Sequence, residues 1–251
     1  MRLGALLGPI VDASEPNALA DQARRYAGEG FESLWSAQAI GRGAMYTDPF
    51  VALSVAAAVT EKVELGTAVV QVPLYHPVDL AHRALSLRQV AGERVLLGVG
   101  AGSTQTDFDA FGRDYASRFR TFGESVEVLR QLFEEGRAGE TNLSPWPAVL
   151  GGLPLLLGSW GKGVERAAAS FDGWIASAHY RTPDQVVEAL DGYRAAGGRR
   201  AVVSTILLGA GTDLGETGDL LGRFAEAGFD DAVVMLLPGG PSAADVRRLV
   251  A

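Results

Sequence analysis

Short apolar runs alternate with longer segments of helical periodicity along the chain. Most of the runs are continuous and do not alternate with polar residues, which is typical of strands buried on both faces. The pattern predicts eight strands, at residues 3–7, 33–36, 63–72, 95–99, 155–157, 174–176, 201–208 and 232–237.

Helix start signals precede most of the periodic segments. Asp48-Pro49 combines a capping side chain with a first-turn proline, and Thr182-Pro183-Asp184-Gln185 reads as a capping box. Helices are predicted at about residues 16–29, 49–60, 77–90, 117–135, 164–170 and 215–227, with two more that start near Thr182 and Ser242.

Eight strands that alternate with eight helices predict an α/β fold, a closed parallel (β/α)8 barrel that spans residues 1–251 as one domain. The alternative is an open doubly wound sheet, which more often has fewer strands. Residues 136–152 are rich in glycine and proline and fit no helix or strand, so they are expected to form a surface connection.

Composition removes several classes of function. The formal net charge is −8 and no basic cluster offsets it, which argues against nucleic acid as a partner. The chain has no cysteine, so disulfides and thiolate metal sites are excluded, and no His/Asp/Glu set has metal-ligand spacing. We therefore expect no metal. No apolar run is long enough to span a bilayer, so we also expect a cytoplasmic protein with no membrane partner.

In a barrel the functional residues lie in the loops that follow the strands, here including residues 8–12 and 37–48. The fourth strand ends in Gly98-Val99-Gly100-Ala101-Gly102. Gly100 and Gly102 would let a flat ligand or a phosphate approach the backbone, although a tight strand-to-loop turn explains them equally well.

The best candidate for an anion site follows the fifth strand. Backbone amides before a helix start would converge there, Ser159 adds a hydroxyl, and Lys162 is one of only two lysines in the chain. The alternative is a capped helix start with a solvated lysine. The candidate phosphate-binding residues are Gly158, Ser159, Trp160, Gly161 and Lys162.

The candidate catalytic residues are His179 on the sixth loop, His76 before Pro77, and Gln38 after the second strand. A lone histidine is more often a structural hydrogen-bonding group than a catalyst, and that reading stays open for both. Neutral hydrogen-bonding side chains dominate the other loops: Gln71, Tyr75, Ser177 and Tyr180. Such a site suits an uncharged heteroaromatic ring better than acid–base hydrolysis.

Several segments, in order, resemble luciferase-like monooxygenases and their deazaflavin-dependent relatives. They are Gly30-Phe31-Glu32-Ser33-Leu34-Trp35, Glu64-Leu65-Gly66-Thr67-Ala68-Val69-Val70, His76-Pro77, Leu97-Gly98-Val99-Gly100-Ala101-Gly102 and Phe171-Asp172-Gly173-Trp174. The resemblance covers roughly residues 3–180 and implies FMN or coenzyme F420 at the carboxyl ends of the strands. It implies a non-proline cis peptide at Ala68-Val69 against the cofactor ring, and phosphate binding by the loop at residues 158–163.

Two departures from the family pattern concern mechanism. The usual catalytic histidine falls at Ala39, which cannot move a proton, and an arginine found in some relatives is Ala101 here. The chain is also shorter than many relatives, so the insertion between the fourth and fifth strands is expected to be short.

The predicted function is a flavin- or F420-dependent oxidoreductase or monooxygenase. It would act on a small organic substrate by hydride transfer or oxygen activation at the cofactor. A flavin reductase as the source of reduced cofactor and a second copy of the chain in a homodimer are candidate partners. Ala39 keeps a non-catalytic flavin-binding barrel as an alternative, and a phosphate-binding lyase or isomerase without flavin is the third reading.

Overall fold

The computed structural model describes residues 1–8, 17–40 and 46–250 and contains a closed barrel of parallel strands. Around the barrel the strands follow the order β1, β2, β3, β5, β8, β9, β10, β11, and β11 pairs with β1 to close the ring. The strands are β1 (Arg2–Leu6), β2 (Ser33–Ser36), β3 (Glu64–Thr67), β4 (Val70–Gln71), β5 (Val95–Gly100), β8 (Leu155–Gly158), β9 (Gly173–Ser177), β10 (Arg200–Leu208) and β11 (Asp231–Leu236). The predicted barrel is therefore confirmed.

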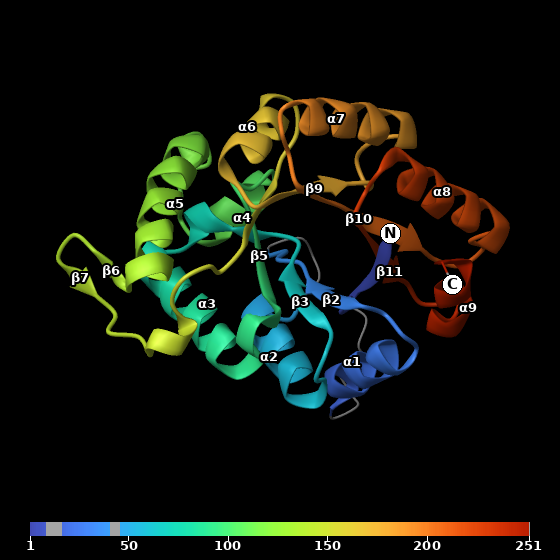
Figure 1. Cartoon of the computed structure of the whole chain (residues 1–251), viewed down its shortest axis with the longest axis horizontal. Coiled ribbons are helices and arrows are strands. Elements are labelled where there is room, and N and C mark those ends of the chain that lie inside the picture. The colour runs from blue at the N-terminus through green and yellow to red at the C-terminus, as the bar shows by residue number, and fades with distance from the viewer. Residues whose placement is uncertain (9–16, 41–45, 251) are drawn as a thin grey trace.

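Helices form an outer layer around the strands, as Figure 1 shows. The side chain of Asp48 accepts hydrogen bonds from the first turn of the second helix, and Thr182 and Gln185 form the predicted capping box. The helices are α1 (Ala18–Gly28), α2 (Pro49–Val59), α3 (Pro77–Ala91), α4 (Gln105–Ala110), α5 (Arg118–Glu135), α6 (Lys162–Ser170), α7 (Pro183–Ala195), α8 (Leu214–Ala227) and α9 (Ala243–Arg247). Short 3₁₀ turns lie at Val72–Leu74, Gly92–Arg94, Pro147–Val149 and Arg248–Val250.

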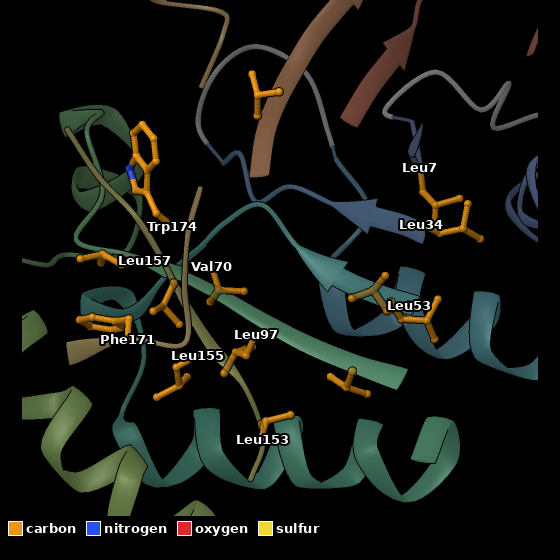
Figure 2. Packing of buried hydrophobic residues seen from close by; sticks show 14 of the residues in the cluster. Leu7, Leu34, Leu53, Val70, Leu97, Leu153, Leu155, Leu157, Phe171 and Trp174 are labelled. Atoms are coloured by element: carbon orange, nitrogen blue, oxygen red, sulfur yellow. The ribbon is translucent and has the colours of Figure 1, made fainter. Parts of the chain in front are cut away.

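Side chains alternate between two apolar layers because successive residues of a strand point to opposite faces. One layer lies between the strands and the helices. Figure 2 shows part of it, with Val70, Leu97 and Leu155 contributed by three neighbouring strands. The other layer fills the barrel and consists of Leu6, Trp35, Leu96, Leu156, Ile175, Val202, Val233 and Met235. Burial on both faces explains why the strands read as continuous apolar runs.

Trp35 fills much of the barrel interior and depends on glycines in both neighbouring strands. A Cβ on Gly66 would lie 2.3 Å from the indole, and a Cβ on Gly4 would lie 2.8 Å from its Nε1 atom. The indole N–H donates a 2.8 Å hydrogen bond to the Ser33 hydroxyl, so the buried donor is satisfied.

A cluster of charged side chains lies at the amino ends of the strands. Arg200 donates to both carboxylate oxygens of Glu64 and of Asp231, at 2.6 to 3.2 Å. Arg2 makes a second contact to each carboxylate at 2.9 Å. Two arginines against two carboxylates balance the charge at the end of the barrel that lies opposite the expected functional site.

Three details differ from the sequence-based expectations. The third strand is not continuous over residues 63–72, because it is interrupted between β3 and β4 at the Ala68–Val69 bond; the cis geometry expected for this bond is confirmed. Residues 136–152 are not wholly irregular, since β6 (Arg137–Ala138) and β7 (Thr141–Asn142) form a small hairpin that projects at the side of the barrel (Figure 1). The helix α4 was not predicted; its six residues are too few to show a clear period.

Among the described residues, no helix combines the length and the apolar character needed to cross a bilayer.

Candidate functional site

Small residues occupy the inward-facing positions at the carboxyl ends of the strands. Strand alternation continued toward the carboxyl ends places Gly8, Ala37, Ala68, Gly100, Gly158, Ser177, Ser204 and Leu237 at inward positions. Six of them lie two residues after a member of the interior layer, Gly100 lies four residues after Leu96, and Ala68 lies two residues after Gly66, which faces Trp35. Seven of these eight are glycine, alanine or serine. The carboxyl end of the barrel, here called the mouth, is therefore lined by short side chains above the layer that contains Trp35, Ile175 and Val202.

The side chain of Val69 projects into this mouth and is supported from two strands. A Cβ on Gly158 would lie 2.7 Å from Val69 Cγ1, and a Cβ on Gly100 would lie 3.0 Å from Val69 Cγ2. Ala68 and Val69 both pack against the interior layer. The two glycines thus make room for a protein side chain, a packing role that the sequence analysis did not anticipate for either of them.

A chain of buried polar groups ties together three of the loops at the mouth. Gln38 Nε2 donates to the Tyr75 hydroxyl at 2.6 Å, and the backbone N–H of Gln71 donates to Gln38 Oε1 at 2.8 Å. Gln71 Nε2 in turn donates to Asp107 Oδ2 at 2.6 Å. Gln38, predicted as catalytic, is thus placed at the mouth with its amide engaged by two protein partners.

Burial raises the pKa of Tyr75 to about 12, and the negative charge of the nearby Asp48 adds to the shift. The phenol therefore keeps its proton throughout the physiological pH range. Because its oxygen already accepts from Gln38, its own hydrogen is the group that it can offer to a ligand.

The loop after β8 contains a buried hydroxyl that has no hydrogen-bond partner in the described part of the chain. Ser159 Oγ is shielded from solvent and makes no hydrogen bond to any described residue. The backbone carbonyl of Ser159 accepts from Trp174 Nε1 at 3.1 Å, which fixes the loop to β9. A buried hydroxyl is normally satisfied, so this one is suited to a polar group brought by a ligand.

The backbone of this loop leads directly into α6. Gly161 is the N-cap residue and has φ of 58° and ψ of −130°, a conformation that favours glycine. The N–H groups of Gly163 and Val164 are already used in turns, by the carbonyls of Trp160 and Gly161. The expected convergence of amides on an anion therefore has fewer donors than the sequence suggested.

Two exposed side chains of the loop lie at its rim. The guanidinium carbon of Arg181 lies 4.8 Å from the centroid of the Trp160 ring, a cation–π contact between the loops after β8 and β9. Lys162 is exposed and opens α6. Arg181 was not singled out from the sequence because nothing in the local pattern shows that it would meet Trp160.

The two candidate histidines have different surroundings. His76 is exposed, and its Nδ1 accepts from the Val78 backbone N–H at 3.3 Å as the N-cap of α3. His179 is also exposed and packs edge-to-face against Tyr180 with 4.4 Å between ring centroids. Its backbone N–H donates to Ser177 Oγ at the mouth, at 3.4 Å. Of the two, His179 is tied to the barrel mouth and His76 has a capping role.

The loop after β5 is fixed in place by contacts that the sequence analysis did not predict. Asp107 is fully buried and binds Gln71, while Arg118 Nε donates to the Gly102 carbonyl at 3.1 Å. A Cβ on Gly102 would lie 2.6 Å from Gln71 Oε1 and from the Phe108 ring. A single aspartate in a polar loop gives no signal that distinguishes it from a solvated one.

Residues 9–12, Pro16 and residues 41–45, which include parts of the expected mouth, lie outside the described residues.

Comparison with known proteins identifies the family. The family model described as luciferase-like monooxygenase matches residues 3–213. The chain belongs to this family.

Two relatives show the extent of the sequence similarity. A protein of Mycobacterium tuberculosis is 32% identical over 217 residues, which cover 81% of this chain and 75% of that protein. The 4-hydroxyprotoasukamycin monooxygenase of Streptomyces nodosus subsp. asukaensis is 34% identical over 142 residues, 52% of this chain and 38% of that enzyme. The chain thus matches well under half the length of the latter enzyme.

Solved structures of the luciferase-like family share the fold at lower identity. An F420-dependent secondary alcohol dehydrogenase in complex with an F420-acetone adduct has a TM-score of 0.78 at 18% identity, with 99% of this chain and 97% of that chain covered. The FMN complex of the oxygenating constituent of 3,6-diketocamphane monooxygenase from Pseudomonas putida has a TM-score of 0.69 at 16% identity, with coverage of 90% and 73%.

Proposed function

We propose that this chain is a flavin- or F420-dependent oxidoreductase that acts on a small organic substrate at the barrel mouth. The observation that carries the proposal is the set of Gly, Ala and Ser residues at the barrel mouth above Trp35, whose short side chains would leave room for a planar cofactor ring. Relatives that use FMN and relatives that use F420 share this fold, and both cofactors carry such a ring and a phosphate.

The residues at the mouth fit such a cofactor. The Ser159 hydroxyl, which bonds to none of the described residues and lies beside the start of α6, would hold the phosphate, with Lys162 adding positive charge at the rim. Ala68 and Val69 would contact the ring, with Gly100 and Gly158 supporting Val69 from behind. Gly102, Trp160 and Gly161 would shape the loops beside this site. They are proposed to contact the part of the cofactor that links its ring to its phosphate.

The bound cofactor would supply hydride transfer or oxygen activation. The protein's part would be to bind and orient the ring and to hold protons near it. Tyr75 keeps its proton at neutral pH and is oriented by Gln38, so it offers a hydrogen-bond donor, and His179 is the proposed acid–base group. Ala39, at the usual histidine position, is buried and offers neither.

Titration of the purified protein with FMN, F420 and riboflavin tests the proposal, with the fluorescence of Trp160 and Trp174 as one readout and cofactor absorbance as another. We expect FMN or F420 to bind, and riboflavin, which lacks the phosphate, to bind at least tenfold more weakly. Ser159→Ala should weaken binding of the phosphorylated cofactor by about tenfold or more, since a hydrogen bond to a charged group contributes about 1.5–3 kcal/mol.

Ser170→Ala, at the exposed far end of the same helix α6, is the matched control and should bind like the parent. Failure of all three compounds to bind would overturn the proposal. Equal affinity for FMN and riboflavin would show that the phosphate contributes nothing to binding, and would contradict a phosphate site at Ser159.

A non-catalytic flavin-binding protein remains the second candidate because of Ala39. Turnover with FMNH2 or F420H2 and a panel of substrates distinguishes the two. If FMN is the cofactor, a separate flavin reductase would supply it in reduced form. A homodimer remains a prediction, and sedimentation of the purified protein tests it.

A further inference from the structure

The order of strands around the barrel places β10 directly across the mouth from β3. Four steps separate the two strands in either direction, through β5, β8 and β9 or through β2, β1 and β11. If a cofactor ring lies with one face against Ala68 and Val69, as proposed above, its other face is directed toward β10. A substrate that reacts with the ring must occupy that side, so β10 bounds the substrate space.

A bulge in β10 presents two hydroxyl side chains at this position. Val203 of β10 pairs with Ala232 of β11, and the next paired residue of β10 is Ile206, opposite Val234. Three steps along β10 therefore correspond to two along β11, which places one extra residue in β10. Val203 and Ile206 both belong to the helix-facing layer, and Ser204 and Thr205 are the two residues between them. Their hydroxyl oxygens are 3.4 Å apart.

The Ser204 and Thr205 hydroxyls lie beside a third hydroxyl, that of Ser177 on the neighbouring strand β9. Ser204 is in register with Ser177 of β9, one of the inward positions at the mouth, and the Ser204 carbonyl accepts from the Ala178 N–H at 2.8 Å. A hydroxyl both donates and accepts, so this group can bind a carbonyl or an alcohol oxygen.

The wall above the hydroxyls is apolar. Leu207 lies between the helix-facing Ile206 and Leu208, and the residue is 39% exposed although it belongs to a barrel strand. Leu237, beyond the end of β11, packs against the barrel interior. Residues 201–208 and 232–237 contain no charged side chain.

The backbone at Thr205 adds a further observation. Its φ is 62°, in the left-handed region, where a β-branched side chain is rarely found and glycine fits without penalty. Backbone strain of this kind clusters at active sites and ligand-binding segments. A glycine would form the same bulge, but it would not bring the hydroxyl.

We propose that Ser204 and Thr205 form the substrate-recognition site: their hydroxyls hold the single carbonyl or hydroxyl oxygen of a neutral, otherwise apolar substrate, whose carbon skeleton contacts Leu207 and Leu237. This inference rests on the proposed function, because it needs the cofactor on the opposite wall. The substrate class follows from two neutral hydroxyls at the base of a wall without charge.

The test uses the cofactor-loaded protein, with cyclohexanone and 2-decanone as oxygenated probes and methylenecyclohexane as a match without oxygen. Binding is followed by the change in cofactor absorbance and by saturation-transfer NMR. The variants are Ser204→Ala, Thr205→Gly and their combination. Thr205→Gly removes the hydroxyl and relieves the strained backbone, so its fold is expected to be intact. Ser125→Ala, a buried serine on α5 away from the mouth, is the control.

We expect the parent and Ser125→Ala to bind cyclohexanone at least fivefold more tightly than methylenecyclohexane. The double variant should lose this preference and keep its affinity for the cofactor. A preference for oxygen that persists in the double variant, or binding of neither oxygenated probe by the loaded parent, overturns the inference. Loss of cofactor affinity in the double variant would assign the hydroxyls to the ring instead. If the parent binds no cofactor at all, the proposed function fails first.

Discussion

The charged cluster at the amino ends of the strands should control stability without affecting the site. Arg200→Met removes a guanidinium that contacts both oxygens of Glu64 and of Asp231, and the Asp231 side chain has no exposed surface. Removal of one partner of a buried ion pair costs about 3–5 kcal/mol because the remaining charge stays buried.

Arg2 remains in contact with both carboxylates, so the loss should fall near the lower limit, about 3 kcal/mol. For a chain of this size, that corresponds to a fall in Tm of roughly 6–12 °C. Urea unfolding followed by circular dichroism gives the free energy directly. Because barrels carry function at the carboxyl ends and stability at the amino ends, cofactor affinity below the new Tm should equal that of the parent.

Arg199→Met is the matched control. The neighbouring Arg199 pairs with Asp172 at 3.3 Å, but its side chain is 75% exposed, and such pairs contribute about 0–1 kcal/mol. Equal losses for the two variants, or a loss under about 1 kcal/mol for Arg200→Met, would refute the view that this cluster is an essential part of the barrel.

Three further predictions concern the barrel interior and its mouth. The folded protein holds the Tyr75 proton up to a pKa of about 12 while the unfolded chain releases it near 10, so its contribution is complete below about pH 10 and is lost as the pH rises to about 12. Tyr75→Phe should therefore flatten the alkaline fall in unfolding free energy, and an identical fall in both proteins would contradict the shift. Gly66→Ala should cost about 1–3 kcal/mol by overpacking against Trp35, whereas Gly222→Ala on α8, with open space around it, should cost nothing; chemical denaturation compares them. His179→Ala should lower turnover by about 10²–10⁴ with cofactor affinity unchanged once a substrate is known, and a change below about threefold would leave His179 a structural role.

The sequence by itself determined the elements and their order. Continuous apolar strands between capped helices specify a parallel barrel because both faces of each strand must be covered, and the landmarks around Trp35, Gly66 and Ala68-Val69 specify the family. The loop at Ser159 was also visible, because serine and glycines before a helix form a local pattern.

Contacts between distant segments were decided only by the tertiary structure. Residues 201–208 read as a regular apolar strand, and only the pairing with β11 shows the bulge that turns Ser204 and Thr205 to the mouth. Gln38, Gln71 and Asp107 meet because closure of the barrel brings the loops after three strands together. Periodicity reports which face of an element is buried, whereas the partners on that face depend on strand register and barrel closure, which no local pattern encodes.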